Sequence, residues 1–249
     1  MSRGTILITG ASSGLGAEMA RQFAALGYDL GLCARRTERL DELRTQILAE
    51  HPGRVVSVKQ LDVTDDTAVF TVFDEFAEEF GTVDRVIVNA GLGKGAPLGT
   101  GHHQANRETA VVNFLAALAQ SEAALKIFRA QGRGHLVMIS SISGLRGMPK
   151  TLTTYAATKA GVAALAEGVR AEAIPGVDVS VIYPGYIRSE MNDRVKHQPK
   201  FMVDTETGVH AMVAAIEKRR ANAYVPGWPW VPLGFALRVL PLPVVRRLI

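Results

Sequence analysis

Cysteine is almost absent from this chain: Cys33 is the single one among 249 residues. One cysteine cannot form an internal disulfide. His102 and His103 stand in a polar segment without a third ligand at usable spacing, so we expect no metal site. Very little chain precedes the first apolar run, too little for a signal peptide. These absences predict a reducing, cytoplasmic setting.

Long apolar runs and a basic stripe are missing as well. No uninterrupted apolar stretch reaches the ~20 residues needed to span a bilayer. The net charge is +4, yet the six charged residues after Glu217 are all basic, so the chain up to Glu217 is slightly acidic. A nucleic-acid-binding groove needs a basic stripe interleaved with groups that read or stack on bases. We therefore expect no nucleic-acid partner.

The sequence does contain a regular alternation of short β-rich runs with longer stretches of helical period. Between the first two runs, Leu15, Met19 and Phe23 repeat every fourth residue and share one helix face. Such alternation is typical of βαβ units on a parallel sheet. The candidate strands span residues 5–9, 29–34, 55–60, 85–89, 135–140, 178–183 and 223–225. We predict a Rossmann-like, doubly wound α/β fold with about seven parallel strands and helices on both faces.

A glycine-rich turn follows the first predicted strand directly and leads into a helix. Its glycines let the backbone approach a ligand, and the free N–H groups of the helix N-terminus attract phosphate. The spacing differs from the usual GxGxxG pattern, and the alternative is a tight connection with a capping serine. We predict that this turn binds the phosphates of a dinucleotide through Gly10, Ser12, Ser13, Gly14, Leu15 and Gly16.

The end of the second predicted strand indicates which dinucleotide is bound. An acidic residue about 20 positions after the glycines holds the ribose hydroxyls of NAD. This chain has Ala34 there, followed by Arg35 and Arg36, and a guanidinium can hold the 2′-phosphate of NADP(H). We predict NADP(H), and we give Arg35 more weight than Arg36 because it is nearer the strand end. The alternative is a solvated helix start whose arginines pair with acidic residues of the same helix.

Tyr155 and Lys159 are four residues apart in an alanine-rich helical stretch, so the phenol and the ammonium share one helix face. Small neighbours favour burial of that face, and a buried lysine needs a partner or a function. Free tyrosine has a pKa of about 10, which a nearby ammonium together with an oxidised nicotinamide ring would lower. We predict that Tyr155 is the general acid in ketone reduction and the general base in alcohol oxidation.

Further motifs stand in a characteristic order along the chain: Leu-Asp-Val at 61–63, Asn-Ala-Gly at 89–91, Asn113, Ser141 and Pro-Gly at 184–185. Together with the glycine-rich turn and the Tyr155/Lys159 pair, they resemble the short-chain dehydrogenase/reductase family over roughly residues 5–225. The resemblance implies that Ser141 hydrogen-bonds the substrate oxygen and stabilises its developing charge. It also implies that Lys159 bonds the nicotinamide ribose.

The same resemblance implies a role for Asn113 and the remaining cofactor contacts. Asn113, inside a helix predicted over residues 108–128, would hold a water that links Lys159 to solvent; the alternative is a buried asparagine that satisfies a backbone group. Asp62 would meet the adenine, and Ser189 would help to hold the nicotinamide carboxamide. The cofactor set beyond the turn and the arginines is Asp62, Val63, Asn89, Ala90, Gly91, Tyr155, Lys159, Pro184, Gly185, Ile187 and Ser189.

One departure from the family pattern concerns the catalytic serine. Ser141 and Tyr155 are one position further apart than is usual, which implies an extra residue in the loop over residues 144–154. Ser140 and Ser143 flank Ser141 and are the alternatives for its role.

These residues predict an enzyme that interconverts a ketone and a secondary alcohol by hydride transfer with NADP(H). One alternative is a nucleotide-dependent epimerase or dehydratase, although little chain remains here for the C-terminal substrate domain of such relatives. Another is a non-catalytic NADPH-binding sensor or scaffold, which would have no reason to keep the catalytic set. The segment over residues 188–203 contains Met191, Val195, Phe201 and Met202, an adaptable and mainly apolar wall that favours a lipophilic carbonyl substrate.

Residues 226–249 differ in composition from the rest of the chain. Five prolines interrupt a segment rich in Trp, Leu and Val that is basic and has no acidic residue. We predict a Pro-rich appendage packed on a catalytic domain of residues 1–225. We expect it to cover the substrate cleft or a partner subunit of a homodimer or homotetramer, because the prolines interrupt any long amphipathic helix. The alternative is contact with a membrane surface, where Trp228, Trp230 and the arginines would meet lipid headgroups.

Overall fold

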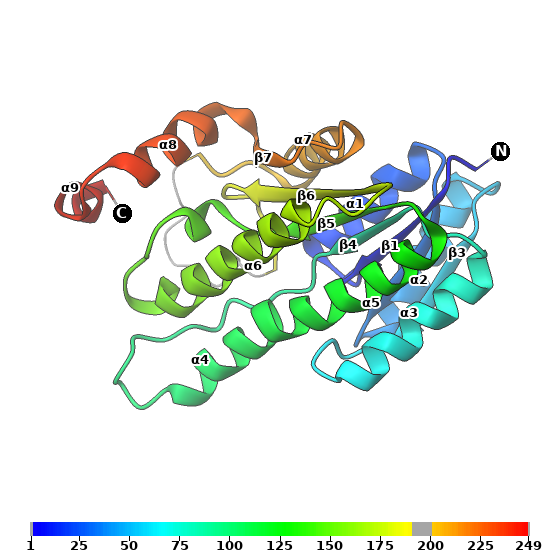
Figure 1. Cartoon of the computed structure of the whole chain (residues 1–249), viewed down its shortest axis with the longest axis horizontal. Helices are drawn as coiled ribbons and strands as arrows, with labels where there is room; N and C mark the ends of the chain where they lie inside the picture. Colours follow the sequence, from blue (N-terminus) through cyan, green and yellow to red (C-terminus); the bar gives the residue numbers. More distant parts are fainter. Residues whose placement is uncertain (1, 191–200, 249) are drawn as a thin grey trace.

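The computed structural model describes residues 2–190 and 201–248, with side chains described up to residue 245. Within these ranges, seven strands form one parallel sheet in the order β3-β2-β1-β4-β5-β6-β7. The strands are β1 (Thr5–Thr9), β2 (Asp29–Ala34), β3 (Val56–Gln60), β4 (Arg85–Val88), β5 (Gly134–Ile139), β6 (Val177–Pro184) and β7 (Asn222–Val225). Helices lie on both faces of the sheet (Figure 1). The predicted Rossmann-like fold is confirmed.

Strands β4 and β5 end one residue earlier than predicted, at Val88 and Ile139. The backbone N–H of Asn89 donates to the hydroxyl of Thr9 at 3.0 Å. The hydroxyl of Ser140 donates to the backbone carbonyl of Lys159 at 2.8 Å. Both residues directly follow their strands, at the edge of the sheet where the functional groups gather.

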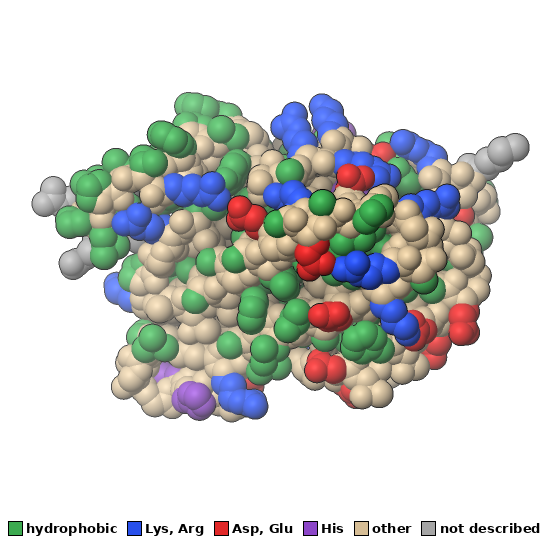
Figure 2. Space-filling view, viewed as in Figure 1, with side chains coloured by type: hydrophobic (Ala, Val, Ile, Leu, Met, Phe, Trp, Pro, Cys, Tyr) green, Lys and Arg blue, Asp and Glu red, His purple; other side chains and the backbone are tan. Residues whose placement is uncertain are grey.

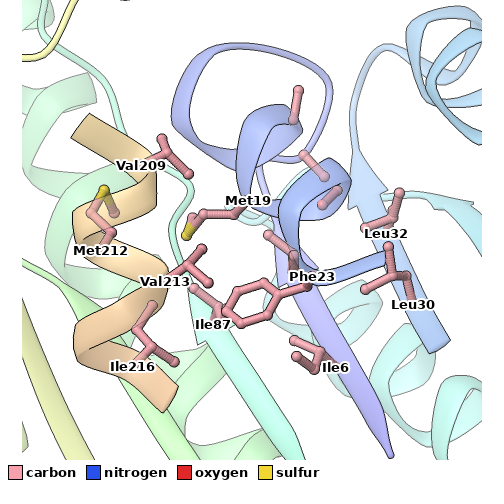
Figure 3. Packing of buried hydrophobic residues seen from close by; sticks show 14 of the residues in the cluster. Ile6, Met19, Phe23, Leu30, Leu32, Ile87, Val209, Met212, Val213 and Ile216 are labelled. Atoms are coloured by element: carbon pink, nitrogen blue, oxygen red, sulfur yellow. The ribbon is translucent and has the colours of Figure 1, made fainter. Parts of the chain in front are cut away.

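Three helices cover the first face of the sheet: α1 (Gly14–Ala25), α2 (Thr37–Glu50) and α7 (Thr205–Glu217). Phe23 of α1 is fully buried and packs with Ile6 and Ile87 of the central strands. Figure 3 shows Met19 and Phe23 facing Met212 and other apolar side chains of α7. The fourth-residue repeat predicted for α1 is thus the stripe that buries this helix.

The second face is covered by α3 (Asp66–Phe80), α5 (Ala116–Gln131) and α6 (Thr153–Ala171). A short helix, α4 (His103–Ala110), continues through the π-helical turn η1 (Val111–Leu115) into α5. By length and composition this combined helix could cross a membrane, which the sequence analysis did not anticipate. Its most apolar window is 56% buried inside the protein, and the core helix of a soluble domain has the same properties.

The site is placed by the point where the strand order reverses. β1 pairs with β2 on one side and with β4 on the other. Strands β1 to β3 therefore form one half of the sheet in sequence order, and β4 to β7 form the other half on the opposite side of β1. Connections after β1 and β4 diverge at this point, and a crevice opens at the carboxyl ends of the strands.

Two helices form the C-terminal segment, α8 (Gly227–Val239) and α9 (Leu242–Leu248). The prolines of residues 226–249 interrupt the C-terminal helices less than predicted. Pro229 and Pro232 lie in the first turn after the non-helical Trp228, where little helical hydrogen bonding is lost, so α8 continues to Val239. Leu240 is extended because it precedes a proline, and this residue separates the two helices.

Candidate active site

A cleft of about 700 Å³ lies at the carboxyl ends of the strands, within the size range of small-molecule and cofactor sites. Every predicted catalytic or cofactor-binding residue lines this cleft except Asn113. The residues come from the turn after β1, the ends of β2 to β6 and the start of α6. In the described part of the chain, no group of three His, Cys, Asp or Glu side chains converges as metal ligands.

The glycine-rich turn forms a cradle that only glycine can build. Gly10 and Gly14 have φ values of 64° and 54°, in the left-handed region. A Cβ on Gly16 would lie 2.4 Å from the carbonyl oxygen of Gly10. Ser13 caps α1 in an extended conformation without a side-chain bond to the helix, so its first N–H groups are free to meet an anion. These features fit the phosphates of a dinucleotide.

Arg36, rather than Arg35, contacts the phosphate-binding turn. Its guanidinium donates to the hydroxyl of Ser13 at 2.6 Å and to that of Ser12 at 3.3 Å. Arg35 extends to Asp62 at 4.0 Å, and its side chain is 71% exposed. The sequence analysis gave Arg35 more weight from its position along the strand. Both arginines line the cleft, and which of them holds the 2′-phosphate stays a prediction.

Arg36 and Arg39 also form ion pairs with Glu190, a residue that the sequence analysis missed. Arg36 lies 3.2 Å from one carboxylate oxygen and Arg39 contacts the other. Hydrogen bonds from Arg39, Arg36 and Ser13 lower the pKa of Glu190. The alternative pairing of these arginines with acidic residues of their own helix is thus not the arrangement seen. Glu190 directly follows Ser189, and that proximity was the only available signal.

Ser141, Tyr155 and Lys159 meet on the floor of the cleft. The Ser141 side chain lies close enough to the Tyr155 phenol to lower its pKa. The Lys159 ammonium donates to the backbone carbonyl of Ile139 at 2.8 Å and lies 6.0 Å from the centre of the Tyr155 ring. Burial lowers the pKa of Lys159 to about 8. The i, i+4 spacing predicted for the helix therefore does place the phenol and the ammonium together.

The pKa of Tyr155 is raised in this structure. Burial raises the pKa most, the nearby Ser141 side chain lowers it, and the neighbouring Tyr186 raises it. The Lys159 ammonium donates to the carbonyl of Ile139 rather than to the phenol. The predicted lowering also depends on an oxidised nicotinamide ring, so it stays a prediction for the cofactor complex.

The position of Ser141 distinguishes it from its neighbours. The hydroxyl of Ser140 is buried against the carbonyl of Lys159. The hydroxyl of Ser141 accepts a hydrogen bond from the backbone N–H of Ser143 at 3.1 Å and lies close enough to Tyr155 to lower the pKa of its phenol. Of the two adjacent serines, Ser141 is thus the one whose hydroxyl meets the phenol.

Comparison with known proteins agrees with this arrangement. A family model described as short chain dehydrogenase matches residues 4–200. The chain belongs to the short-chain dehydrogenase/reductase family. It is therefore an oxidoreductase of the class that acts on alcohols and ketones. An uncharacterized oxidoreductase of Mycobacterium tuberculosis is 52% identical to this short-chain dehydrogenase over 248 residues, covering 99% of this chain and 98% of the relative.

Three solved structures share the fold of this short-chain dehydrogenase. A short-chain dehydrogenase from Sphingobium yanoikuyae in complex with NADPH is 28% identical, with a TM-score of 0.82 and coverage of 94% of this chain and 93% of that one. The bulky-bulky ketone specific alcohol dehydrogenase from Comamonas testosteroni is also 28% identical, with a TM-score of 0.80 and coverage of 95% and 92%. A short-chain dehydrogenase/reductase from Burkholderia phymatum in complex with NAD is 22% identical, with a TM-score of 0.84 and coverage of 99% and 95%, and shows the fold alone.

Asn113 lies in the π-helical turn η1, outside the cleft lining. The helix predicted over residues 108–128 is therefore not regular at this residue. Its side-chain amide accepts from the backbone N–H of Leu92 at 2.7 Å and donates to the Leu92 carbonyl at 2.8 Å. The side chain thus satisfies backbone groups, which was the alternative interpretation. A role of Asn113 in holding a water stays a prediction.

The substrate end of the cleft contains residues that the sequence analysis did not single out. Tyr186 lines the cleft and packs edge-to-face on Trp230, with ring centroids 5.3 Å apart. Thr151 and Leu152, in the predicted extra-residue loop, also line it and form part of a short 3₁₀ helix. Tyr186 follows the Pro-Gly motif, which was the one signal that could have indicated it.

The predicted substrate segment is described only in part. Met191 and Val195 lie outside the described residues. Phe201 is 57% exposed, and Val203 forms a parallel bridge with Ile187. The described residues that flank this segment therefore bring it back beside the nicotinamide end of the predicted cofactor site.

Proposed function

We propose that this protein reduces a lipophilic ketone to a secondary alcohol with NADPH, or catalyses the reverse reaction. The observation that carries the proposal is that Ser141, Tyr155 and the buried ammonium of Lys159 line one continuous cleft with a phosphate-binding turn. A cleft that joins an anion cradle to a proton donor suits hydride transfer coupled to proton transfer.

The residues of the chain have separate tasks in this reaction. The turn would hold the cofactor phosphates, and Arg36 and Arg35 would hold the 2′-phosphate. Asp62 and Val63 would contact the adenine. Ile187 and Ser189 would hold the nicotinamide carboxamide. NADPH supplies the hydride when bound. Tyr155 donates its phenolic proton to the ketone oxygen, and Ser141 stabilises the negative charge that develops there. Lys159 favours the resulting phenolate electrostatically before solvent returns the proton.

NADP(H) is favoured over NAD(H) by the charges at the end of β2. Arg36 presents a guanidinium beside Ser12 and Ser13, and Ala34 contributes no carboxylate that would repel a 2′-phosphate. The relative from Sphingobium yanoikuyae was solved with NADPH, which supports the same choice.

A bulky, lipophilic ketone is favoured by the substrate end of the cleft. Leu92, Val111, Val112, Leu152 and Tyr186 line it. The related alcohol dehydrogenase from Comamonas testosteroni is specific for bulky-bulky ketones, which supports a substrate of this kind. A cytoplasmic location and a homodimer or homotetramer stay predictions, and light scattering of the purified chain would test the second.

The deciding experiment is a screen of bulky ketones that follows NADPH absorbance, with the parent protein and the Tyr155→Phe variant. This substitution removes only the transferable proton, so turnover should fall by about 10²–10⁴-fold while NADPH affinity is retained. If the variant keeps most of the parent turnover on a verified substrate, the proposal is wrong. A parent protein that binds NADPH but reduces none of the ketones would favour the sensor or scaffold alternative.

A further inference from the structure

Large apolar side chains are exposed along one side of the C-terminal helices. The exposed fractions are 79% for Trp228, 51% for Val231, 69% for Phe235, 58% for Val239 and 52% for Leu242. We call these five residues the tail face. Figure 2 shows hydrophobic side chains gathered over α8 and α9, at one end of the molecule. Contiguous apolar surface of this kind marks an interaction site rather than ordinary protein surface.

The tail face lies opposite the side by which α8 is attached to the domain. Val231, Phe235 and Val239 follow i, i+4 spacing and share one helix face. Trp230, 5% exposed, packs on Tyr186, and Gly234 is buried against Ile142 and Leu145. The apolar residues of α8 therefore form two sides, of which one secures the helix and the other is presented outward. Of the two roles predicted for this segment, covering the cleft accounts only for the attached side, whereas the outward side needs a partner.

The charges around the tail face favour an anionic surface over a second copy of the chain. Arg238 is exposed on α8 and is held over the ring of Tyr224, 5.8 Å from its centroid. The chain contains no acidic residue after Glu217, and its last four residues add Arg246 and Arg247. A twofold contact through this segment would place arginines near arginines without a carboxylate to pair them. Anionic lipid headgroups would supply the missing negative charge.

We propose that the tail face docks on the surface of an anionic phospholipid bilayer, with α8 lying in the interface. Phe235, Val231 and Val239 enter the headgroup and acyl boundary, the Trp228 ring lies at headgroup level, and Arg238 meets lipid phosphate. Trp230 connects the docked helix to Tyr186 at the substrate end of the cleft. If the proposed function also holds, a membrane-dissolved ketone is delivered next to the catalytic residues.

Vesicle binding of the full chain tests the docking without any assay of activity. The protein is sedimented with vesicles of phosphatidylcholine alone and with vesicles that also contain phosphatidylglycerol, at low and high salt. We expect binding to the mixed vesicles, with a blue shift of tryptophan fluorescence, and clearly weaker binding to the neutral vesicles or at high salt. Absence of binding to mixed vesicles at low salt, or equal binding to both kinds, overturns the proposal.

Matched variants identify the surface that binds. Phe235→Glu should lower the partition coefficient at least about tenfold, because it removes a buried ring and adds a repelled charge. Arg238→Gln should lower it roughly fivefold. Leu98→Glu is the control, since Leu98 is an equally exposed apolar residue, 65%, outside the tail face. If Leu98→Glu weakens binding as much as Phe235→Glu, the tail face is not the docking surface.

Circular dichroism and light scattering separate loss of vesicle binding from misfolding and from dimer formation. Circular dichroism confirms that Phe235→Glu is folded, and Trp228→Ser, outside the regular part of α8, replaces it if it is not. Light scattering without vesicles detects a dimer, and loss of a dimer in Phe235→Glu with no vesicle binding by the parent would assign the face to a second copy. Because ketone reduction is measured separately, failure of docking leaves the proposed function intact, and inactivity leaves the docking result intact.

Discussion

Asn113 bonds both backbone groups of Leu92, the N–H at 2.7 Å and the carbonyl at 2.8 Å. Asn106, two helical turns earlier, bonds both backbone groups of Ala96 in the same way, at 2.9 and 3.0 Å. These two amides fasten the loop after β4, of which residues 92–95 form one wall of the cleft. The helix that contains η1 thus positions the loop through side chains rather than through strand pairing.

Asn113→Ala should destabilise the protein and loosen this wall. The substitution leaves the N–H and the carbonyl of Leu92 without their partners, which costs about 1–3 kcal/mol. Chemical denaturation measures the change, and Asn106→Ala should have an effect of similar size. An unchanged midpoint for Asn113→Ala would show that water replaces the amide at no cost. Turnover should fall in Asn113→Ala because the cleft wall moves.

Lys159→Met should stabilise the protein while it abolishes turnover. Burial lowers the pKa of Lys159 to about 8, so the folded protein holds an ammonium that the unfolded chain solvates better. Removing it should raise the free energy of unfolding at pH 7 by about 1–3 kcal/mol, less than the full pKa shift implies because the carbonyl of Ile139 loses its donor. Denaturant titrations of both proteins measure this difference.

The pH dependence of the stability gained in Lys159→Met tests whether the buried ammonium causes that gain. Between pH 8 and the unfolded pKa, the unfolded chain binds more protons at Lys159 than the folded protein does, so the parent gains stability as pH rises. The advantage of Lys159→Met should therefore shrink between pH 7 and pH 9. An advantage independent of pH would mean that packing, and not the buried charge, causes it.

His135 should make the protein sensitive to acid. It is fully buried, its Nδ1 accepts from Arg85 at 3.0 Å, and its Nε2 bonds the hydroxyl of Ser180 at 2.8 Å. Burial first, then the charges of Arg85 and Arg219, lowers its pKa from 6.5 to about 3. The unfolded chain therefore binds a proton between these pH values that the folded protein does not.

The stability that depends on neutral His135 is complete above its unfolded pKa and falls as pH decreases toward about 3. Between pH 7 and pH 5 the loss from this one group should be about 2 kcal/mol. Unfolding measured at both values should show a smaller loss for His135→Gln, which cannot titrate. Equal losses in parent and variant would mean that His135 is not the cause of the acid sensitivity.

Arg36→Ala should weaken NADPH binding more than Arg35→Ala does. Arg36 contacts Ser12 and Ser13 of the phosphate-binding turn, whereas Arg35 is directed to Asp62. Loss of a charge-assisted bond to a 2′-phosphate should cost roughly ten- to a hundredfold in affinity. Calorimetry with NADPH and NADH measures the ratio, and NADH affinity should change little. A larger loss of NADPH affinity in Arg35→Ala would show that Arg35 is the main contact of the 2′-phosphate, as predicted from the sequence.

The elements and most of the site were predictable because they depend on local periodicity and spacing. The helical repeat of Leu15, Met19 and Phe23 requires one buried face, and the glycines of the turn permit backbone conformations that other residues avoid. The four-residue separation of Tyr155 and Lys159 places both on one helix face wherever that helix lies. These features depend only on residues close together in sequence, and all of them are present in the structure.

Directions of side chains across the cleft depended on the tertiary structure alone. Arg36 turns toward the phosphate-binding turn because Glu190, far along the chain, returns beside it. Asn113 bonds Leu92 because the loop after β4 folds back over η1. Lys159 donates to Ile139 at the end of β5, and burial at this place lowers its pKa. These contacts join residues with no fixed separation in sequence, so spacing could indicate which residues meet at the site but not which partner each one selects.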